Sequence, residues 1–374
     1  MNKKKIAMLI SHYGEDFLTY RINFLKYLEN LGYDTVAVVS DDKFKTEIKN
    51  TGISAYFYKY NHSILAIFNI ISAFLFFNKS IKKEKPDVVF TYKFFPNLIG
   101  LYAASKLKIK NIIGTVAGLG FLDKYNKNVI IKIIFLLYVH ILKKANYIVV
   151  QNCDDKKIFE KFLNKEKIII TDGSGVNGAQ FKFINQLYSR KNYNLEDDCI
   201  YFIFCSRIVK EKGIFELIEA FNKISIEELN IGLLIAGWFN NKIMEAKVLE
   251  KLKGNKKIIY FGYQKNVKAL ISLSDCVILP SYYAEGIPRT LTEALALSKP
   301  IITTNHKGCR ETCIDGKNGF LVNIKDIKDL EEKMKKFILL SNEKKHEMGK
   351  VSSNLFENKF EQNIIFKKIV NNVL

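Results

Sequence analysis

The stretch CVILPSYYAEGIPRTLTEALALSKPIITT, residues 276–304, contains the pattern that decides the fold. It starts with the apolar run Cys276–Pro280, passes through a loop into a segment of helical length, and ends in a second apolar run, Ile301–Thr304. Short apolar runs on either side of a helical segment are typical of two parallel strands joined by a crossover helix. The stretch therefore predicts one βαβ unit of a sheet that is covered on both faces.

The same alternation extends along the rest of the chain, and it predicts an α/β protein. In the first half the predicted strands are Ile6–Ile10, Thr35–Ser40, Ala55–Tyr58, Val88–Tyr92, Asn111–Val116, Tyr147–Gln151 and Ile168–Thr171. The predicted helices between them include Phe17–Leu31, Leu65–Lys83 and Val129–Lys144. The second series of strands is Ile200–Cys205, Gly232–Ala236, Lys257–Phe261, Cys276–Pro280, Ile301–Thr304 and Phe320–Val322.

A break between the two series predicts two Rossmann-like, doubly wound domains. The turn-forming cluster Gly173–Gly178 and the polar, aperiodic segment Asn185–Asp198 separate them. We expect an N-terminal domain over residues 1–175 and a C-terminal domain over residues 190–355. The last stretch, residues 356–374, contains a predicted helix, Glu357–Val373, that we expect to pack back on the first domain. Ligands of such sheets bind beyond the carboxyl ends of the strands, so we expect the domains to face each other across a cleft.

The formal charge of +20 permits several interpretations. It is consistent with nucleic acid, with an anionic membrane surface, or with a composition that is simply rich in Lys, Ile and Asn. Residues 1–175 hold 27 basic and 15 acidic side chains and so carry 12 of the net charges. This basic half contains an apolar, aromatic stretch, Ile64–Phe77, and the combination suits contact with anionic lipid headgroups. The stretch is shorter than the ~20 residues of a spanning helix, so we do not expect an integral membrane protein.

The sequence shows neither a clear targeting segment nor a clear set of metal ligands. Ile6–Ile10 is too short for a signal peptide and lacks a small-residue cleavage site, so it is interpreted as a buried strand. The six cysteines form no CxxC pair, and His306, Cys309 and Cys313 lack a fourth ligand for zinc. A reducing cytoplasm fits these single cysteines best.

Two carboxylates in the opening stretch form the most informative candidate site. Glu285 stands in the loop before Pro288, and Glu293 lies inside the helix that follows. The N–H groups at such a helix start, together with the helix dipole, favour phosphate binding. Eight helical residues span ~12 Å, which is comparable to the reach across a diphosphate. The two acids are therefore candidates to hold the two ends of a nucleotide sugar, and the alternative is a pair of solvated helix acids.

A second loop offers two positive charges. Arg207 and Lys212 follow the first strand of the second domain. A guanidinium and an ammonium at this spacing can hold a diphosphate and offset charge that builds on a leaving nucleotide. The alternative interpretation of Lys210–Lys212 is a solvated helix start.

With these motifs in place, the chain resembles the retaining GT-B glycosyltransferases of family 4. Glu285 and Glu293, separated by seven residues, resemble the family's EX7E motif, and the continuation from Ala294 to Ile302 also matches except that Ser298 replaces a usual glycine. The resemblance implies a GT-B fold, catalytic roles for Glu285, Arg207 and Lys212, and retention of anomeric configuration. It further implies donor binding by residues around the second carboxylate and by the strand-end segment that holds the base: Glu293, Gly286, Ile287, Pro288, Gly262 and Tyr263.

The first domain has fewer matches to the family. His12 and Gly14 leave the first strand where the family places a loop close to the donor phosphates, although a loop histidine without a catalytic part is an equal alternative. Gly118 and Gly120 allow backbone to approach a sugar. Many members carry a histidine near this point, and this chain does not. Asp123 is a weak candidate for a base there, Arg21 lies on the first helix, and His140 is expected to be a core residue.

Within the family, the loops at Ser11–His12, Gly118–Gly120 and Gly308–Glu311 resemble those of bacterial enzymes that build lipid-linked oligosaccharides, O-antigen and capsule. An α-1,3-N-acetylgalactosaminyltransferase of general protein glycosylation is one of them. This resemblance implies a UDP-N-acetylhexosamine donor, an undecaprenyl-diphosphate-linked saccharide acceptor, a peripheral position on the cytoplasmic face of the inner membrane, and no metal or other cofactor.

Other functions remain open. A nicotinamide enzyme would need a GxGxxG turn after the first strand, and residues 11–16 lack it. A nucleic-acid binder is supported by charge alone. A UDP-sugar 2-epimerase of the same architecture and a GDP-mannose-type mannosyltransferase are the nearest enzymatic alternatives.

Overall fold

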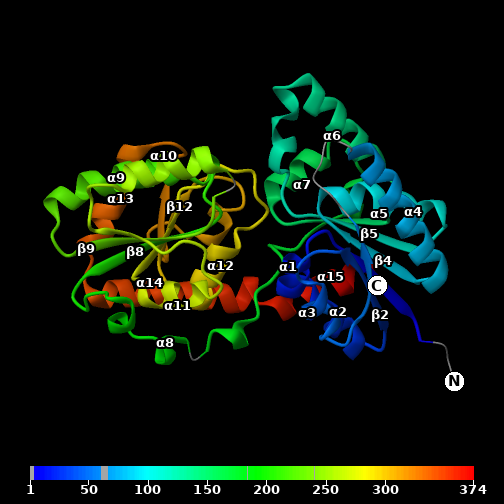
Figure 1. The fold of residues 1–374 in the computed structure, drawn as a ribbon, viewed down its shortest axis with the longest axis horizontal. Helices are drawn as coiled ribbons and strands as arrows, with labels where there is room; N and C mark the ends of the chain where they lie inside the picture. Colours follow the sequence, from blue (N-terminus) through cyan, green and yellow to red (C-terminus); the bar gives the residue numbers. More distant parts are fainter. Residues whose placement is uncertain (1–3, 60–65, 183, 240) are drawn as a thin grey trace. The chain divides into compact units, whose positions relative to one another are not determined.

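The computed structural model describes residues 4–59, 66–182, 184–239 and 241–374. The contacts within the chain divide it into two compact units, each built around a parallel sheet (Figure 1). Unit 1 comprises Met1–Gly175 and Ile365–Leu374, and unit 2 comprises Val176–Ile364. The second unit thus begins before the predicted boundary at residue 190 and extends beyond residue 355.

Unit 1 contains a seven-stranded parallel sheet in the order β3-β2-β1-β4-β5-β6-β7. The order reverses between β1 and β4, as it does in a doubly wound fold. Its strands are β1 (Ile6–Ile10), β2 (Asp34–Ser40), β3 (Ser54–Tyr58), β4 (Val88–Tyr92), β5 (Asn111–Val116), β6 (Tyr147–Val150) and β7 (Ile168–Ile170). Its helices are α1 (Gly14–Asp16), α2 (Ile22–Asn30), α3 (Lys45–Lys49), α4 (Ala66–Glu84), α5 (Phe94–Lys106), α6 (Val129–Leu142) and α7 (Cys153–Phe159).

Unit 2 contains a six-stranded parallel sheet in the order β10-β9-β8-β11-β12-β13. Its strands are β8 (Ile200–Cys205), β9 (Ile231–Ala236), β10 (Ile258–Tyr260), β11 (Cys276–Leu279), β12 (Ile301–Thr304) and β13 (Gly319–Val322). Its helices are α8 (Ile184–Leu187), α9 (Ile214–Glu227), α10 (Lys242–Leu252), α11 (Val267–Leu273), α12 (Arg289–Ala296), α13 (Ile327–Ile338) and α14 (Asn342–Leu355). The α/β class and the parallel sheets predicted from the sequence are confirmed.

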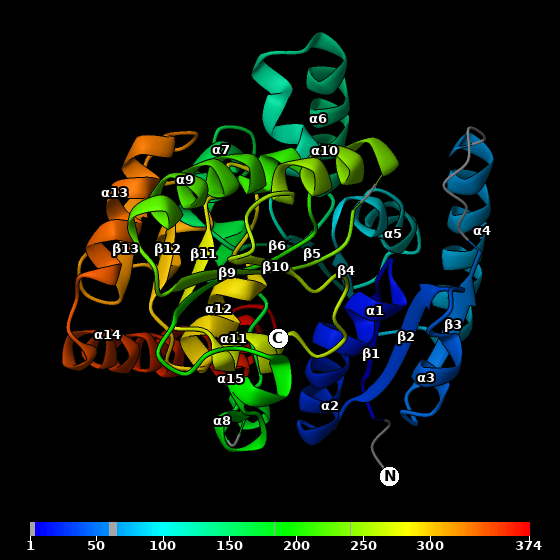
Figure 2. The same cartoon turned by 60° about the vertical axis from the view of Figure 1, so that its left-hand side comes forward.

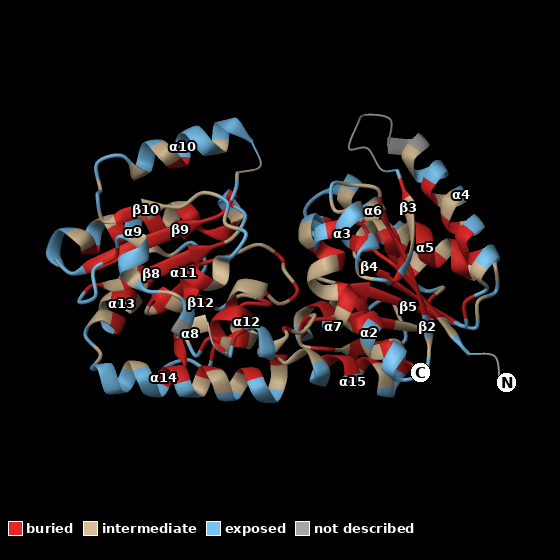
Figure 3. Ribbon diagram, turned by 60° about the horizontal axis from the view of Figure 1, so that its bottom comes forward, coloured by how far each residue is buried: buried red, intermediate tan, exposed pale blue. Residues whose placement is uncertain are grey.

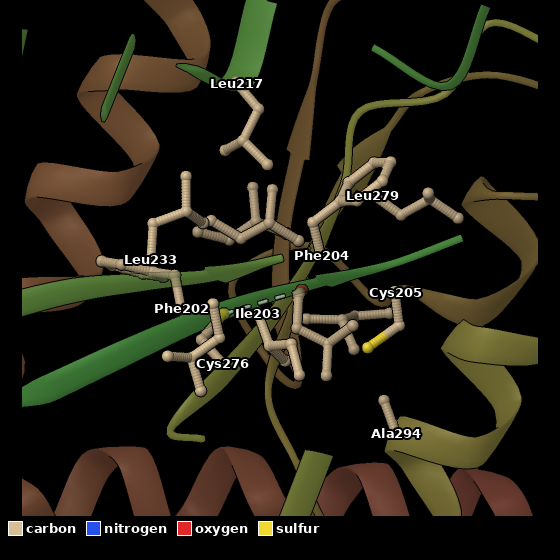
Figure 4. Close-up of a cluster of buried hydrophobic side chains, with 14 of the residues drawn as sticks. Phe202, Ile203, Phe204, Cys205, Leu217, Leu233, Cys276, Leu279 and Ala294 are labelled. Atoms are coloured by element: carbon tan, nitrogen blue, oxygen red, sulfur yellow. Dashed lines mark hydrogen bonds between the residues drawn. The ribbon is translucent and has the colours of Figure 1, made fainter. Parts of the chain in front are cut away.

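Most strands are buried on both faces, which explains why their sequences are continuous apolar runs; the edge strands β3 and β10 are only partly buried. Figure 3 shows the strands of both sheets in red between helices whose outer faces are exposed. In unit 2, Leu217 of α9 packs on one face of the sheet, while Ala294 of α12 lies on the other, close to Cys205 (Figure 4). Burial of this apolar surface stabilises the unit and fixes the register of the strands that carry the candidate site.

One predicted helix of the first half differs from the helix observed in the described residues. The predicted helix Phe17–Leu31 contains a π-helical turn, Phe17–Arg21, before α2 begins. The helix predicted from Leu65 is α4, which begins at Ala66; residues 64 and 65 lie outside the described residues.

The helix predicted over about Glu357–Val373 is observed for most of its length, but it does not extend unbroken to Glu357. A π-helical turn, Phe356–Phe360, follows α14, and α15 (Gln362–Val373) begins only after an extended Glu361. The backbone of Val176 occupies the break, because its N–H donates to the Phe360 carbonyl at 3.1 Å and its carbonyl accepts from the Gln362 N–H at 3.0 Å. Phe360 belongs to the core of unit 2, whereas four apolar residues of α15 belong to the core of unit 1: Ile365, Phe366, Ile369 and Val373.

Ser298 lies just after the C-terminal end of α12, and its backbone has the left-handed conformation, with φ of 55°. A side chain at such a position costs about 1 kcal/mol relative to glycine. We therefore expect Ser298→Gly to raise the free energy of unfolding of unit 2 by up to about 1 kcal/mol. Denaturant unfolding followed by the fluorescence of Trp238, the chain's single tryptophan, measures it. Ser298→Ala keeps the strain and should give no gain; an equal gain from both variants would contradict this explanation.

Candidate functional site

The candidate donor-site residues of the second half gather at one edge of the unit 2 sheet. Arg207 follows β8, Gly262 follows β10, Glu285 follows β11 and Gly308 follows β12. All these strands are parallel, so their carboxyl ends meet at the same edge. Unit 2 alone therefore assembles loops that are far apart in the sequence into one candidate site.

An ion pair between Lys212 and Glu285 lies at the centre of this site. The Lys212 Nζ is 2.5 Å from Glu285 Oε1, and both side chains are largely buried. Ser281, in the turn after β11, donates its hydroxyl to the same carboxylate oxygen at 3.0 Å. An ion pair shielded from water is held more firmly than a surface pair, so this contact fixes the positions of both side chains.

The backbone of two loops holds this pair in place. The N–H of Tyr282 donates to the Glu211 carbonyl at 2.8 Å, which joins the loop after β11 to the turn before Lys212. Gly213 follows with φ of 78°, and a Cβ at this position would lie 2.2 Å from the Pro280 carbonyl oxygen. Only glycine permits this approach, so Gly213 sets the spacing between the two charged side chains.

Glu293 lies on α12 and is buried, so the interpretation of a solvated helix acid does not hold. Arg289, one turn earlier on the helix, forms an ion pair with its Oε1. The carboxylate also lies close to Cys205, since burial, and then the charge of Glu293, raise the pKa of the Cys205 thiol. Glu285 stands in a loop outside the helix, so the separation of the two acids is not set by helical rise alone.

The start of α12 lies between these two acids. Pro288 is the N-cap residue and Arg289 is the first helical residue. The first N–H groups of a helix have no carbonyl partner within it, and the dipole adds positive potential there. Gly286 and Ile287 lead into this start, and Gly308 packs against the carbonyl of Gly286 so closely that a Cβ would lie 2.0 Å from its oxygen. The close contact between Gly308 and Gly286 thus fixes the backbone that leads into the helix start.

Arg207 is exposed beside this site, and its guanidinium lies 5.7 Å from the ring centre of Tyr283. The ammonium of Lys212 lies 5.9 Å from the same ring. Both cations therefore lie near the same aromatic ring. Beneath them, burial, and then the charge of Glu285, raise the pKa of Cys309 to about 12, so this cysteine remains a neutral thiol.

An exposed pair of aromatic side chains, Trp238 and Tyr263, lies at the same edge. Only Tyr263 was predicted from the sequence. Tyr263, predicted to bind the donor, follows Gly262, which has φ of 67°. Its ring meets Trp238 edge to face, with 5.8 Å between ring centres. Trp238 follows β9 and is exposed, although tryptophan side chains are usually buried for the most part. The sequence feature that could have indicated Trp238 is the position of the single tryptophan directly after the glycine that follows a strand.

In unit 1, His12 and Gly14 lie at the carboxyl end of β1 and are both buried. The Nδ1 atom of His12 is 3.0 Å from the Tyr58 hydroxyl. The N–H of Gly14 donates to Asp42 at 2.8 Å, and a Cβ there would collide with the Asp42 carboxylate. In this structure Gly14 thus supports the loop through Asp42, and its N–H is already engaged.

The other first-half candidates lie after β5 and on nearby helices. Gly118 and Gly120 have φ of 91° and 54°, which places both in the left-handed region that glycine favours. Asp123 is half-buried in the 3₁₀ helix Gly120–Asn126. The prediction that His140 is a core residue is wrong, because it lies on the exposed face of α6. Arg21 is buried, and its guanidinium stacks 3.8 Å from the Tyr92 ring centre.

Among the residues that the structure describes, no group of three or more His, Cys, Asp or Glu side chains has the arrangement of a metal site. Across the same residues, no single helix has the length and apolarity needed to cross a membrane. The 3₁₀ helix Gly120–Asn126 and α6 pass that test only when taken together, and they are bent by 113° relative to each other.

Comparison with known families identifies the chain. Residues 186–354 match the family model of glycosyl transferases group 1, and residues 5–152 match the glycosyl transferase 4-like model. The capsular polysaccharide biosynthesis glycosyltransferase CapM of Staphylococcus aureus is 30% identical over 82% of this chain and 81% of its own length. The chain therefore belongs to the group 1 glycosyltransferases, the retaining hexosyltransferases of family 4.

Two further similarities support this assignment. The N,N'-diacetylbacillosaminyl-diphospho-undecaprenol alpha-1,3-N-acetylgalactosaminyltransferase of Campylobacter jejuni is 25% identical over 90% of this chain and 89% of its own length. Among solved structures, Anabaena Alr3699/HepE in complex with UDP and glucose superimposes with a TM-score of 0.81, at 14% identity and 98% coverage of both chains. The GT-B fold inferred from the sequence is confirmed.

Gly213 offers a test of how the site is held. Gly213→Ala places a Cβ against the Pro280 carbonyl, so the two loops must separate and the Lys212–Glu285 contact must lengthen. We expect a loss of more than about 2 kcal/mol in the free energy of unfolding and weaker binding of UDP. Gly254→Ala is the matched control, because Gly254 has φ of 94° but nothing within 4 Å of an added Cβ. It should cost only the backbone strain, about 1 kcal/mol, and should leave UDP binding unchanged.

Proposed function

We propose that this protein transfers an N-acetylhexosamine from a UDP-sugar, with retention, to an undecaprenyl-diphosphate-linked saccharide in the synthesis of a bacterial surface glycan or glycoprotein. The observation that carries the donor half of this proposal is the buried Lys212–Glu285 ion pair beside the start of α12. In this pair an ammonium group, which we propose binds the diphosphate, lies next to a carboxylate, which we propose binds the sugar hydroxyls. The relative from Campylobacter jejuni, which is named for a diphospho-undecaprenol acceptor and an N-acetylgalactosaminyl group, supports the acceptor half.

Each charged residue has a separate part in the proposed donor complex. Arg207 and Lys212 bind the diphosphate, and the N–H groups at the start of α12 bind the same anion. Glu285 accepts hydrogen bonds from hydroxyls of the transferred sugar, while Glu293 accepts from the ribose. Lys212 already contacts Glu285, so the incoming diphosphate shares an ammonium that is held in position before binding. This arrangement reduces the cost of ordering the site around the donor.

In the proposed reaction the bond between the anomeric carbon and the β-phosphate oxygen breaks, and UDP leaves. The oxygen of an acceptor hydroxyl forms a bond to the anomeric carbon on the face that the diphosphate occupied, and its proton passes to the leaving phosphate. Arg207, Lys212 and the start of α12 stabilise the negative charge that develops on that phosphate. We propose that these groups replace a metal ion in this step, so the enzyme requires no metal and no other cofactor.

The aromatic pair Trp238 and Tyr263 completes the proposed donor site. Both rings lie beyond the carboxyl ends of neighbouring strands, β9 and β10. An exposed aromatic face at this edge suits stacking of a nucleobase. We propose that the base of the donor packs against this pair, next to Gly262.

The charged residues of the site can be tested by substitution. Arg207→Ala, Lys212→Ala and Glu285→Gln should each lower the rate of sugar transfer by about a hundredfold or more, because each removes a charge that acts on the diphosphate or the sugar. Rates are measured with purified protein, a UDP-N-acetylhexosamine and a diphospho-undecaprenol-linked saccharide. Lys210→Ala, which removes an exposed cation from the same turn, is the control and should retain activity. Unchanged transfer in both the Arg207 and Glu285 variants would refute the proposed site.

The identity of the donor can be tested by direct binding. Because Trp238 is the chain's only tryptophan, its fluorescence should change when UDP binds, and Trp238→Leu should weaken UDP binding about tenfold by calorimetry. A screen of UDP-, GDP- and ADP-sugars by thermal shift identifies the donor class. Stabilisation by UDP-N-acetylhexosamines alone is expected. A response to GDP-mannose alone would instead favour a mannosyltransferase.

A further inference from the structure

The helix α6 in unit 1 carries large apolar side chains on both its inner and its outer face, and only Lys132 and His140 on the outer face are charged or polar. Its inner face packs into the unit through Phe135, Tyr138, Val139 and Leu142, which are spaced as one helical face. The outer face of a helix in a water-soluble domain is normally polar. Here it is built mainly from large apolar side chains that are exposed: Val129, Ile130, Ile133, Leu136 and Leu137.

This exposed face is a continuous feature of the helix. Val129 is 74% exposed, Ile130 is 70% exposed and Leu137, two turns further along, is 59% exposed. Phe121, in the preceding 3₁₀ helix, is also exposed. Figures 1 and 2 show α6 and this short helix projecting away from the sheet of unit 1. Apolar side chains gathered in this way mark a surface that meets an apolar partner.

The charges around α6 point to the kind of partner. Between Leu119 and Cys153 the chain contains five lysines and one acidic residue, Asp123. The lysines are Lys124, Lys127, Lys132, Lys143 and Lys144, which flank the apolar face at both ends and interrupt it once. An apolar face bordered by lysines complements the boundary between acyl chains and anionic headgroups.

The position of α6 in the chain connects this surface to the loop at Gly118 and Gly120, which is predicted to approach a sugar. Gly118 and Gly120 end the segment that leaves the carboxyl end of β5, and α6 begins after the next short helix. A membrane surface at α6 would therefore lie close in the chain to the segment that is predicted to approach a sugar. An acceptor whose lipid remains in the bilayer could be held at such a place.

We propose that the exposed face of α6, together with Phe121, docks the protein on a membrane that contains anionic lipids. This inference rests on the proposed function, since it concerns where the lipid-linked acceptor is met. It assigns the contact to α6, whereas the sequence suggested the stretch Ile64–Phe77, most of which forms α4. Ile64 and Leu65 of that stretch lie outside the described residues.

Sedimentation with lipid vesicles tests the assignment. The full chain should bind vesicles of phosphatidylglycerol and phosphatidylcholine, and more weakly bind vesicles of phosphatidylcholine alone. The double variant Ile133→Glu, Leu137→Glu should lower the apparent affinity for the mixed vesicles at least about tenfold, because it places two charges in the apolar face. Leu75→Glu is the matched control, as it adds a charge to an exposed apolar position on α4, and it should bind as the unmodified chain does.

Donor binding separates this inference from the proposed function. The α6 double variant should retain the fluorescence response of Trp238 to UDP, which shows that unit 2 is folded, and its circular dichroism should be unchanged. Normal vesicle binding by this variant, or loss of binding only in Leu75→Glu, would overturn the assignment to α6. A different result would also overturn it: the unmodified chain binds neither kind of vesicle and forms a dimer, and the double variant is monomeric. In that case a second copy of the chain would cover the exposed face of α6. Failure of UDP to bind, with vesicle binding intact, would instead count against the proposed donor site.

Discussion

The contact between Lys212 and Glu285 is the interaction on which the candidate site depends. It joins the turn after β8 to the loop after β11, and both loops also contact each other through the backbone. A buried cation without its partner is costly, so neither side chain can be moved independently. Gly213 permits the close approach that makes the pair possible. The rest of the site, including the start of α12, is positioned relative to these two loops.

The parallel sheet provides the larger constraint. Because every strand of unit 2 runs in the same direction, the segments after β8, β9, β10, β11 and β12 emerge at one edge. That edge collects two cations, two carboxylates and two exposed aromatic rings from separate parts of the chain. Such a set matches the parts of a nucleotide sugar: a diphosphate, hydroxyl groups and a base. The local chemistry of this edge is therefore consistent with the family assignment.

The two units differ in how well the sequence described them. In unit 2, Glu285 and Glu293 follow a local pattern of strand, loop and helix, and the structure places both where that pattern suggests. In unit 1 the prediction for His140 was wrong, because α6 is apolar on its outer face and composition alone does not tell an inner face from an outer one. The break at Glu361 was also missed, since it depends on hydrogen bonds to Val176, a residue distant in the sequence.

The sequence by itself determined the strands, the crossover helices and the α/β class, because apolar runs and helical periodicity are local properties of the chain. It also singled out the two acids and the two cations of the candidate donor site, Glu285, Glu293, Arg207 and Lys212. Only the tertiary structure decided that Lys212 pairs with Glu285, that Trp238 meets Tyr263, and that Asp42 engages the Gly14 N–H. These contacts join residues from different loops, and strand order, which the local pattern does not encode, brings those loops together.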